Sequence, residues 1–271
     1  MNTRTDLAVE SNAMQKGKVA GVCVKERREG DIKITSVEIK TEQAAKKLGK
    51  RVGHYVTLDV GSISGGLAET DGAAHIISEE IKKMMGDFSS ALIIGVGNPN
   101  LTADALGPKT ADGVLATRHL RKDFAESIGL SGLKSVAVLS PGVLGKTGME
   151  AVEIIKSVCD TAKPDVVIAV DALAAADNAR LGTTVQVSDC GISPGSGIGN
   201  RRKEISEQTL GVPVVAVGVP TVADMSENDR GYIITLREID LLVTRGAELL
   251  SHAINFALQP NIDREVLLSL V

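Results

Sequence analysis

The sequence predicts a three-layer α/β sandwich around a mostly parallel sheet, with a small β appendage at the N-terminus. From residue 71 onward, helical stretches alternate with short runs that are apolar throughout, which is typical of parallel strands covered by helices on both faces. Before residue 61, the chain instead contains three runs of β character and one short helical stretch. With 43% apolar and 24% charged residues, a chain of 271 residues can bury a core of this size.

The expected elements follow in order along the chain. Residues 1–17 are polar and without periodicity, so we expect a flexible arm. In the appendage we expect strands at 19–25, 32–39 and 54–60 and a helix at 41–48. Core strands are expected at 91–97, 135–140, 166–171, 183–188 and 213–218. Helices are expected between them at 71–86, 108–121, 148–160 and 202–210, and a long amphipathic helix at 236–258.

Composition argues against several classes of protein. An aromatic content of 2%, no Trp and a net charge of −4 argue against a nucleic-acid-binding surface. The three cysteines show no metal-ligand spacing, and neither do the four histidines, so we expect no metal and no cofactor. No apolar run is long enough to span a bilayer, and the first residues lack the apolar segment of a signal peptide. We therefore expect a cytoplasmic protein without a membrane partner.

Two aspartates are the strongest candidates for chemistry. Ligands of open α/β sheets bind beyond the carboxyl ends of the strands. Asp171 ends an apolar strand that has no polar residue in its preceding five positions, and Asp104 lies in the loop after the first core strand. Either acid alone could be structural, as a hydrogen-bonding group or, for Asp104, as a helix N-cap. Two carboxylates close enough to share a proton can instead activate a water and protonate a leaving amine.

The loops after the same strands supply further candidates for the lining of a cleft. These are Asn98, Gly142, Gly195, Ser196 and Asp224.

A nucleotide-binding site is the alternative from another class. The Gly-x-Gly at 95–97 begins a dinucleotide motif, but the position of its third glycine is Asn100. The Gly-Lys-Thr at 145–147 resembles the end of a phosphate-binding loop, but the first glycine of that motif falls on Ser140. Because the apolar strand ending in Asp171 is similar to the magnesium-binding strand of such enzymes, a P-loop-like nucleotide hydrolase stays open as an alternative.

Several long segments resemble the germination protease family of spore-forming bacteria. They are RTDLAVE at 4–10, GVGNPNLTADALGPK at 95–109, RHL at 118–120, SPGVLGKTGME at 140–150, VVIAVDALAA at 166–175, SDCGISPGSGIGNRRKEIS at 188–206, TLGVPVVAVGVPTV at 209–222, and LREID and AINFALQP near the C-terminus. The resemblance implies a fold akin to the hydrogenase-maturation peptidases. It also implies a homotetrameric, aspartic-type endopeptidase of the forespore and spore core that degrades small acid-soluble spore proteins during germination.

The resemblance also implies roles for particular residues. The aspartate pair proposed for the family falls on Asp104 and Asp171. The family cleaves after an acid that is followed by a hydrophobic residue and alanine, and Asp6, Leu7 and Ala8 match this preference. This implies a zymogen that cuts itself between Asp6 and Leu7. Residues 1–17 would then contain the pro-segment, and residues 18–271 would form a single α/β peptidase domain.

Two features depart from the family pattern. Ser193 stands where the family usually has histidine. After residues 220–225 the chain runs almost directly to its last helix, where other members insert several dozen residues. A catalytically silent homologue that binds a peptide in the cleft therefore stays open as a second alternative.

Overall fold

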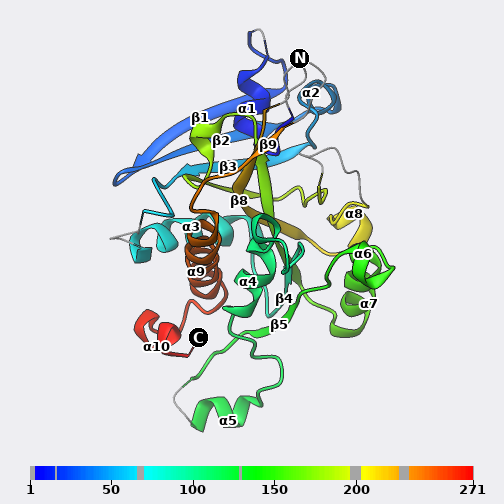
Figure 1. The fold of residues 1–271 in the computed structure, drawn as a ribbon. Helices are drawn as coiled ribbons and strands as arrows, with labels where there is room; N and C mark the ends of the chain where they lie inside the picture. The colour runs from blue at the N-terminus through cyan, green and yellow to red at the C-terminus, as the bar shows by residue number, and fades with distance from the viewer. Residues whose placement is uncertain are drawn as a thin grey trace.

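A computed structural model describes residues 4–15, 17–65, 70–127, 130–195, 203–225 and 232–270. These residues build helices around a nine-stranded sheet with the order β1-β2-β3-β7-β8-β6-β4-β5, in which β9 also pairs with β8 (Figure 1). The strands are β1 (Val22–Glu29), β2 (Ile32–Ile39), β3 (Gly53–Asp59), β4 (Ser90–Gly95), β5 (Ser135–Leu139), β6 (Val166–Ala175), β7 (Thr184–Ser188), β8 (Val214–Asp224) and β9 (Ile233–Ile234).

The helices precede, connect and follow these strands. They are α1 (Ala8–Ala13), α2 (Glu42–Leu48), α3 (Thr70–Met85), α4 (Leu106–Asp112), α5 (Lys122–Ser127), α6 (Leu144–Thr147), α7 (Ala151–Ala162), α8 (Glu207–Leu210), α9 (Ile239–Leu258) and α10 (Arg264–Ser269), with the 3-10 turns η1 (Thr102–Asp104) and η2 (Asn178–Arg180).

The sheet has a parallel half and an antiparallel half. Strands β5, β4, β6 and β8 pair in parallel, whereas β7, β3, β2 and β1 continue the same sheet with antiparallel pairs. The expected appendage is therefore an extension of the central sheet. The expectation that β7 belongs to the parallel core is wrong. Only residues 176–183 separate β6 from β7, which is too short for the crossover that a parallel connection requires.

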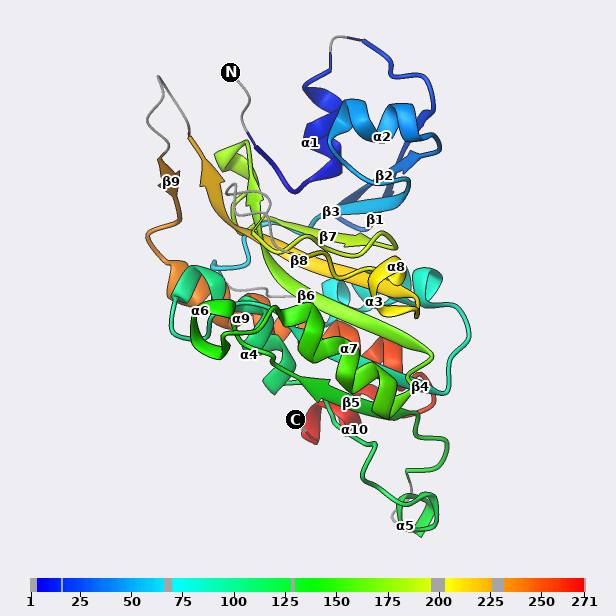
Figure 2. The same cartoon turned by 90° about the vertical axis from the view of Figure 1, so that its right-hand side faces the viewer.

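Helices cover both faces of the sheet and make the expected three layers. On one face, α3 and α9 pack on the alternate residues of the strands, such as Ile168 and Val170 of β6. On the other face, α7 and α8 cover Val167 and Ala169 of the same strand, and Figure 2 shows both helices on the near side of the sheet. Further along this face, α1 and α2 pack on β2 and β3 around Tyr55. This confirms the predicted α/β sandwich.

Two of the expected helices are much shorter than the sequence pattern indicated. The helix expected at 108–121 ends at Asp112, because the following backbone is held by a side chain of α9. The amide of Asn255 accepts a hydrogen bond from the Leu115 N–H at 2.9 Å and donates one to the Gly113 carbonyl at 3.0 Å. In the helix expected at 202–210, the structure assigns helix only to α8.

The N-terminal arm was expected to be flexible, and for residues 4–15 this is wrong. Leu7 and Ala8 are fully buried, and α1 begins at Ala8. The buried carboxylate of Glu10 accepts hydrogen bonds from the backbone N–H groups of Ala176 at 2.8 Å and Asp177 at 3.0 Å. The arm is short and polar overall, but Leu7, Ala8 and this one carboxylate have partners on the sheet.

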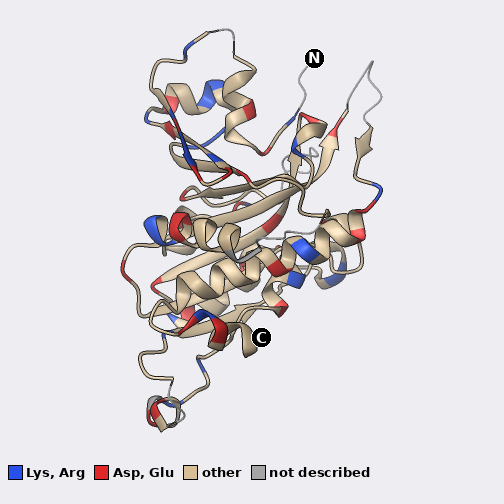
Figure 3. Cartoon of the chain, turned by 90° about the vertical axis from the view of Figure 1, so that its left-hand side faces the viewer, with Lys and Arg blue, Asp and Glu red and all other residues tan. Residues whose placement is uncertain are grey.

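Charges of both signs are interspersed over the face shown in Figure 3. The strand β1 at the edge of the sheet contains Lys25, Arg27 and Arg28 together with acidic residues, and most of it is exposed. Charged side chains on an edge strand hinder pairing with another chain.

Candidate functional site

Asp171 lies in the middle of a strand and not at its end as the sequence suggested. Strand β6 continues to Ala175, but its neighbour β4 makes its last pair between Gly95 and Val170. Asp171 is therefore the first residue of β6 beyond the carboxyl end of β4. It is 6% exposed, and its Oδ1 accepts a hydrogen bond from the Ala172 N–H at 2.9 Å. The side chain lies on the face that carries α7, since its neighbour Val170 packs on the opposite face.

Asp104 reaches the same place from the loop after β4. It is the last residue of η1, and its Oδ2 accepts a hydrogen bond from the Asn98 N–H at 2.8 Å. Gly97 has a φ of +125°, and a Cβ there would lie 2.0 Å from the Asp104 carbonyl oxygen. Gly107 allows an equally close approach, because a Cβ there would lie 2.2 Å from the Val96 carbonyl oxygen. The two glycines thus allow the loop and α4 to pack tightly against the strand ends.

Both aspartates line one pocket, of about 490 Å³, at this edge of the parallel half. Of the residues predicted to line a cleft, Asn98, Gly142 and Gly195 lie on its wall. Ser196 lies outside the described residues. Asp224 is not among the lining residues, because it lies at the far end of β8, where its carboxylate accepts a hydrogen bond from the Arg4 N–H at 3.4 Å.

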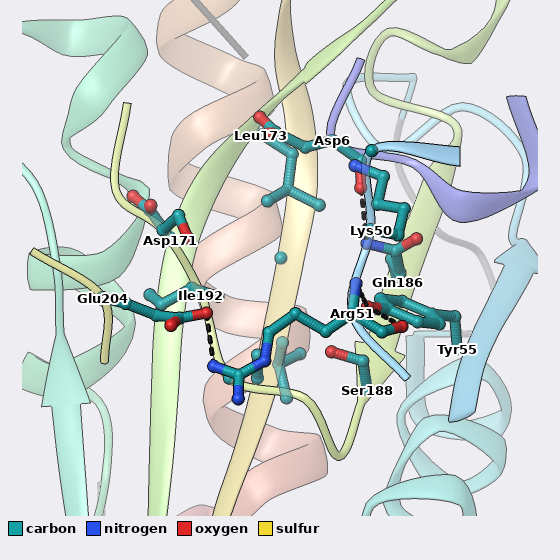
Figure 4. A pocket seen from close by; sticks show the side chains of 16 residues that line it. Asp6, Lys50, Arg51, Tyr55, Asp171, Leu173, Gln186, Ser188, Ile192 and Glu204 are labelled. Carbon is teal, nitrogen blue, oxygen red and sulfur yellow. Dashed lines mark hydrogen bonds and ion pairs between the residues drawn. The ribbon is translucent and has the colours of Figure 1, made fainter. Parts of the chain in front are cut away.

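A second pocket, of about 250 Å³, lies on the other side of Asp171 (Figure 4). Its wall is polar: an ion pair joins Arg51 to Glu204, and the Tyr55 hydroxyl accepts a hydrogen bond from the Arg51 N–H at 3.0 Å. Burial raises the pKa of the Tyr55 hydroxyl, so this group stays protonated. Asp171 lines both pockets, which makes it the junction between them.

Sequence reasoning missed two residues of the smaller pocket, Lys50 and Gln186. Burial lowers the pKa of the Lys50 amine, while the negative charges of Asp6 and Glu10 raise it. Gln186 is 7% exposed and is a large polar residue in the middle of a strand that is buried throughout. That polar interruption is a signal that the sequence contained. Nothing in the sequence pointed to Lys50, because it follows a surface helix.

The predicted self-cleavage site lies beside these pockets. Asp6 lines both of them together with Asp171. The Asp6 N–H donates to the Ala174 carbonyl oxygen at 2.8 Å, and the Ala174 N–H donates to the Asp6 Oδ2 at 2.9 Å. The Leu7 side chain is fully buried against Leu173 and Ala175. The arm thus contacts the strand that carries Asp171 within a few residues of that acid.

The structure disfavours the nucleotide-binding alternative. Lys146 and Thr147 are exposed on the four-residue helix α6, and neither lines the pockets that contain Asp171, which disfavours a phosphate-binding loop. Burial raises the pKa of the Cys190 thiol to about 12, so it is protonated and a poor nucleophile. Within the described residues, no three His, Cys, Asp or Glu side chains are grouped so as to hold a metal ion. The helices that the structure describes include none of the length and apolarity needed to cross a membrane.

Comparison with known proteins assigns the class and then the family. The sequence matches the family model for germination protease over residues 2–230. The germination protease of Clostridium tetani is 36% identical over 98% of this chain and 98% of its own length, and that of Caldanaerobacter subterraneus subsp. tengcongensis is 38% identical over 98% and 97%. The matches define the protein as a peptidase by class. Within that class, the chain belongs to the germination protease family.

Two further matches describe how the chain differs from its relatives. The germination protease of Priestia megaterium is 44% identical over 82% of this chain but 64% of its own length. The alignment with the C. tetani protein spans 319 positions, more than the 271 residues here, so that relative contains segments that this chain lacks. Among solved structures, the [NiFe] hydrogenase maturation protease HycI from Thermococcus kodakarensis KOD1 is similar, with 18% identity, a TM-score of 0.37, and coverage of 65% of this chain and 98% of that one.

Proposed function

We propose that the protein is an endopeptidase that degrades small acid-soluble spore proteins during germination. In this proposal it is made as a zymogen that cuts itself between Asp6 and Leu7, and an aspartate pair activates the attacking water. The observation that carries the proposal is the shared pocket, which is lined by Asp104, Asp171 and the arm residue Asp6. This shared lining supports a single site for the proposed catalytic acids and the proposed scissile bond.

The chemistry needs one ionised and one protonated carboxyl group. The ionised member of the pair, Asp104 or Asp171, takes a proton from water as the water oxygen bonds to the scissile carbonyl carbon. The protonated member stabilises the developing oxyanion and then gives its proton to the leaving amine as the C–N bond breaks. The products are a carboxylate on Asp6 and an amine on Leu7. Close carboxyl groups favour this arrangement, because two like charges side by side cannot both ionise easily.

The test replaces each acid with its isosteric amide and follows loss of the N-terminal peptide by mass spectrometry. Asp104→Asn and Asp171→Asn are each expected to slow processing by roughly 10²–10⁴-fold, the usual contribution of a positioned acid or base. Asp160→Asn is the control, because Asp160 is exposed on α7, where it pairs with Lys156. Processing of either site variant at the control rate would exclude an aspartate pair.

Incubation with a purified small acid-soluble spore protein separates this proposal from a silent, peptide-binding homologue. The processed enzyme is expected to cut the spore protein, as seen on a gel, and a silent homologue would bind it uncut. We place the enzyme in the spore core as a homotetramer that makes no direct contact with nucleic acid. Light scattering on the purified chain tests the oligomeric state, and a monomer would contradict that part of the proposal.

A further inference from the structure

The arm is bound to the sheet as an extended peptide at the proposed scissile bond. Lys50 Nζ donates a hydrogen bond to the Thr5 carbonyl oxygen at 2.8 Å. Gln186 Nε2 donates to the Asp6 carbonyl oxygen at 3.1 Å, and Gln186 Oε1 accepts from the Ala8 N–H at 2.9 Å. One side-chain amide therefore holds backbone groups on both sides of the Asp6–Leu7 bond. It pairs with the arm as the backbone of a neighbouring strand would.

Gln186 lies in a row of residues that crosses the sheet to Asp171. Gln186 is paired with Gly218 of β8, and Gly218 with Asp171 of β6, so the three residues share one face of the sheet. At about 4.8 Å between strands, the Cα atoms of Gln186 and Asp171 are about 10 Å apart. A Cβ on Gly218 would lie 2.6 Å from the Asp171 carbonyl oxygen, so this position is restricted to glycine. A peptide held by Gln186 therefore lies beside the row of residues that leads across Gly218 to Asp171.

Each of the three arm residues that match the cleavage preference has its own surroundings. The carboxylate of Asp6 accepts the Ala174 N–H and lies in the field of the Lys50 amine, and both residues line the smaller pocket (Figure 4). The Leu7 side chain fills an apolar cluster, and Ala8 is fully buried where α1 packs on the sheet. The positions thus favour an acid, a large apolar residue and a small residue, in this order.

We propose that Lys50, Gln186 and the backbone of Ala174 form the substrate-recognition site. Lys50 recognises the acidic residue before the cut, and Gln186 positions the scissile carbonyl. In the uncut chain the arm occupies this site, and after processing the same groups bind an extended peptide with an acid, a large apolar residue and alanine in succession. The role in cleavage rests on the proposed function, whereas the docking of the arm does not.

The first experiment measures docking without reference to catalysis. Hydrogen exchange of the amides in residues 4–15 is followed by mass spectrometry in the full uncut chain, with intact mass as the check that the arm is attached. Lys50→Met and Gln186→Met are each expected to speed exchange by about tenfold or more, because each loses a hydrogen bond to the arm. Lys47→Met is the matched control, since Lys47 is an exposed lysine of the neighbouring helix α2.

Coupling to Asp6 identifies what Lys50 recognises. Asp6→Asn is expected to speed exchange as well. In the Lys50→Met background Asp6→Asn is expected to add little, because the attraction between the Asp6 carboxylate and the Lys50 amine is already removed. Unchanged exchange in Lys50→Met, or fully additive effects of the two substitutions, would overturn the assignment of Lys50 to the acid. Unchanged exchange in Gln186→Met would overturn the role of the amide.

The second experiment tests recognition of a separate substrate. The processed protein is offered two peptides that differ only in having Asp or Asn before the scissile bond. The wild type is expected to prefer the Asp peptide by about tenfold or more in kcat/KM, and Lys50→Met to lose this preference while Lys47→Met keeps it. A preference that survives Lys50→Met overturns the proposal. If the wild type cuts neither peptide while the exchange results hold, the proposed function fails and the arm-docking site stands.

Discussion

The two halves of the sheet contribute different parts of the candidate site. The parallel half places Asp104 and Asp171, through the end of β4 and the strand beside it. The antiparallel half places Gln186 on β7 and Lys50 just before β3, and these residues hold the arm. The pockets meet at Asp171, where β6 and β8 of one half adjoin β7 of the other.

In the proposed function, the parallel half supplies the catalytic acids and the antiparallel half supplies side chains that bind the peptide. Carboxyl ends of parallel strands meet at one edge of a sheet, so acids in their loops converge as a consequence of the topology. The antiparallel strands instead present a broad face, and the Gln186 side chain points from it towards the arm. A long peptide can bind along such a face, whereas the proposed pair of catalytic aspartates acts on a single peptide bond.

The largest effect is expected in the parallel half, from Gly97→Ala. The new Cβ would lie 2.0 Å from the Asp104 carbonyl oxygen, and the residue would keep a φ of +125° that side chains disfavour. We expect the free energy of unfolding to fall by about 3 kcal/mol, together with loss of processing because Asp104 is displaced. Urea denaturation checks the first effect. Gly145→Ala is the control, since a Cβ there has open space, and a Gly97→Ala chain of wild-type stability would contradict the packing argument.

The parallel half could be predicted from the sequence because its signals are local. Strands apolar on both faces, such as β6, are visible as runs of Val, Ile and Ala, and the acid after such a run marks the edge of the sheet. The residue pattern of β6 does not indicate where the neighbouring strand β4 ends. Strand β6 outlasts β4 by five residues, from Asp171 to Ala175, so the sequence pattern placed Asp171 at the end of a strand that in fact continues to Ala175.

The antiparallel half could not be predicted in the same way, because its residues depend on distant partners. The direction of β7 follows from the short connection after β6, which residue patterning does not reveal. The arm looked flexible because only a few of its residues are apolar. Its binding depends on Gln186, Lys50 and Ala174, which are between 45 and 180 positions away in the sequence.

A smaller effect is expected from loosening the arm with Leu7→Ala. Leu7 is fully buried against Leu173, but the arm can detach without unfolding the rest of the sheet. We expect the local opening free energy to fall by about 2 kcal/mol, which would speed trypsin cleavage within the arm by roughly 30-fold. Met14→Ala, at a side chain that is 47% exposed, is expected to leave the rate unchanged. Equal rates for both variants would show that burial of Leu7 against β6 does not hold the arm.

The smallest effect concerns the end of the β3–β7 ladder, where His54 Nδ1 lies 2.7 Å from Asp189 Oδ2. The hydrogen bond to Asp189 raises the pKa of His54, so protonated His54 stabilises the folded chain. This contribution is fully present below the unfolded pKa of about 6.5 and is lost as the pH rises through the folded pKa. Because the His54 side chain is 58% exposed, screening limits it to under about 1 kcal/mol.

Urea denaturation of the wild type and His54→Gln measures this contribution of the antiparallel half. The wild type is expected to be the more stable at about pH 5.5, with the difference vanishing by about pH 8.5 and shrinking in added salt. In an Asp189→Asn background the pH-dependent effect of His54→Gln is expected to shrink, because the main carboxylate that raises the His54 pKa is gone and only the weaker contribution of Glu38, whose Oε1 lies 3.6 Å from His54 Nε2, is left. A stability advantage of the wild type over His54→Gln that grows with pH would be opposite in sign to the expected linkage between His54 protonation and folding. It would mean that His54 and Asp189 do not stabilise the end of the ladder on which Gln186 is carried.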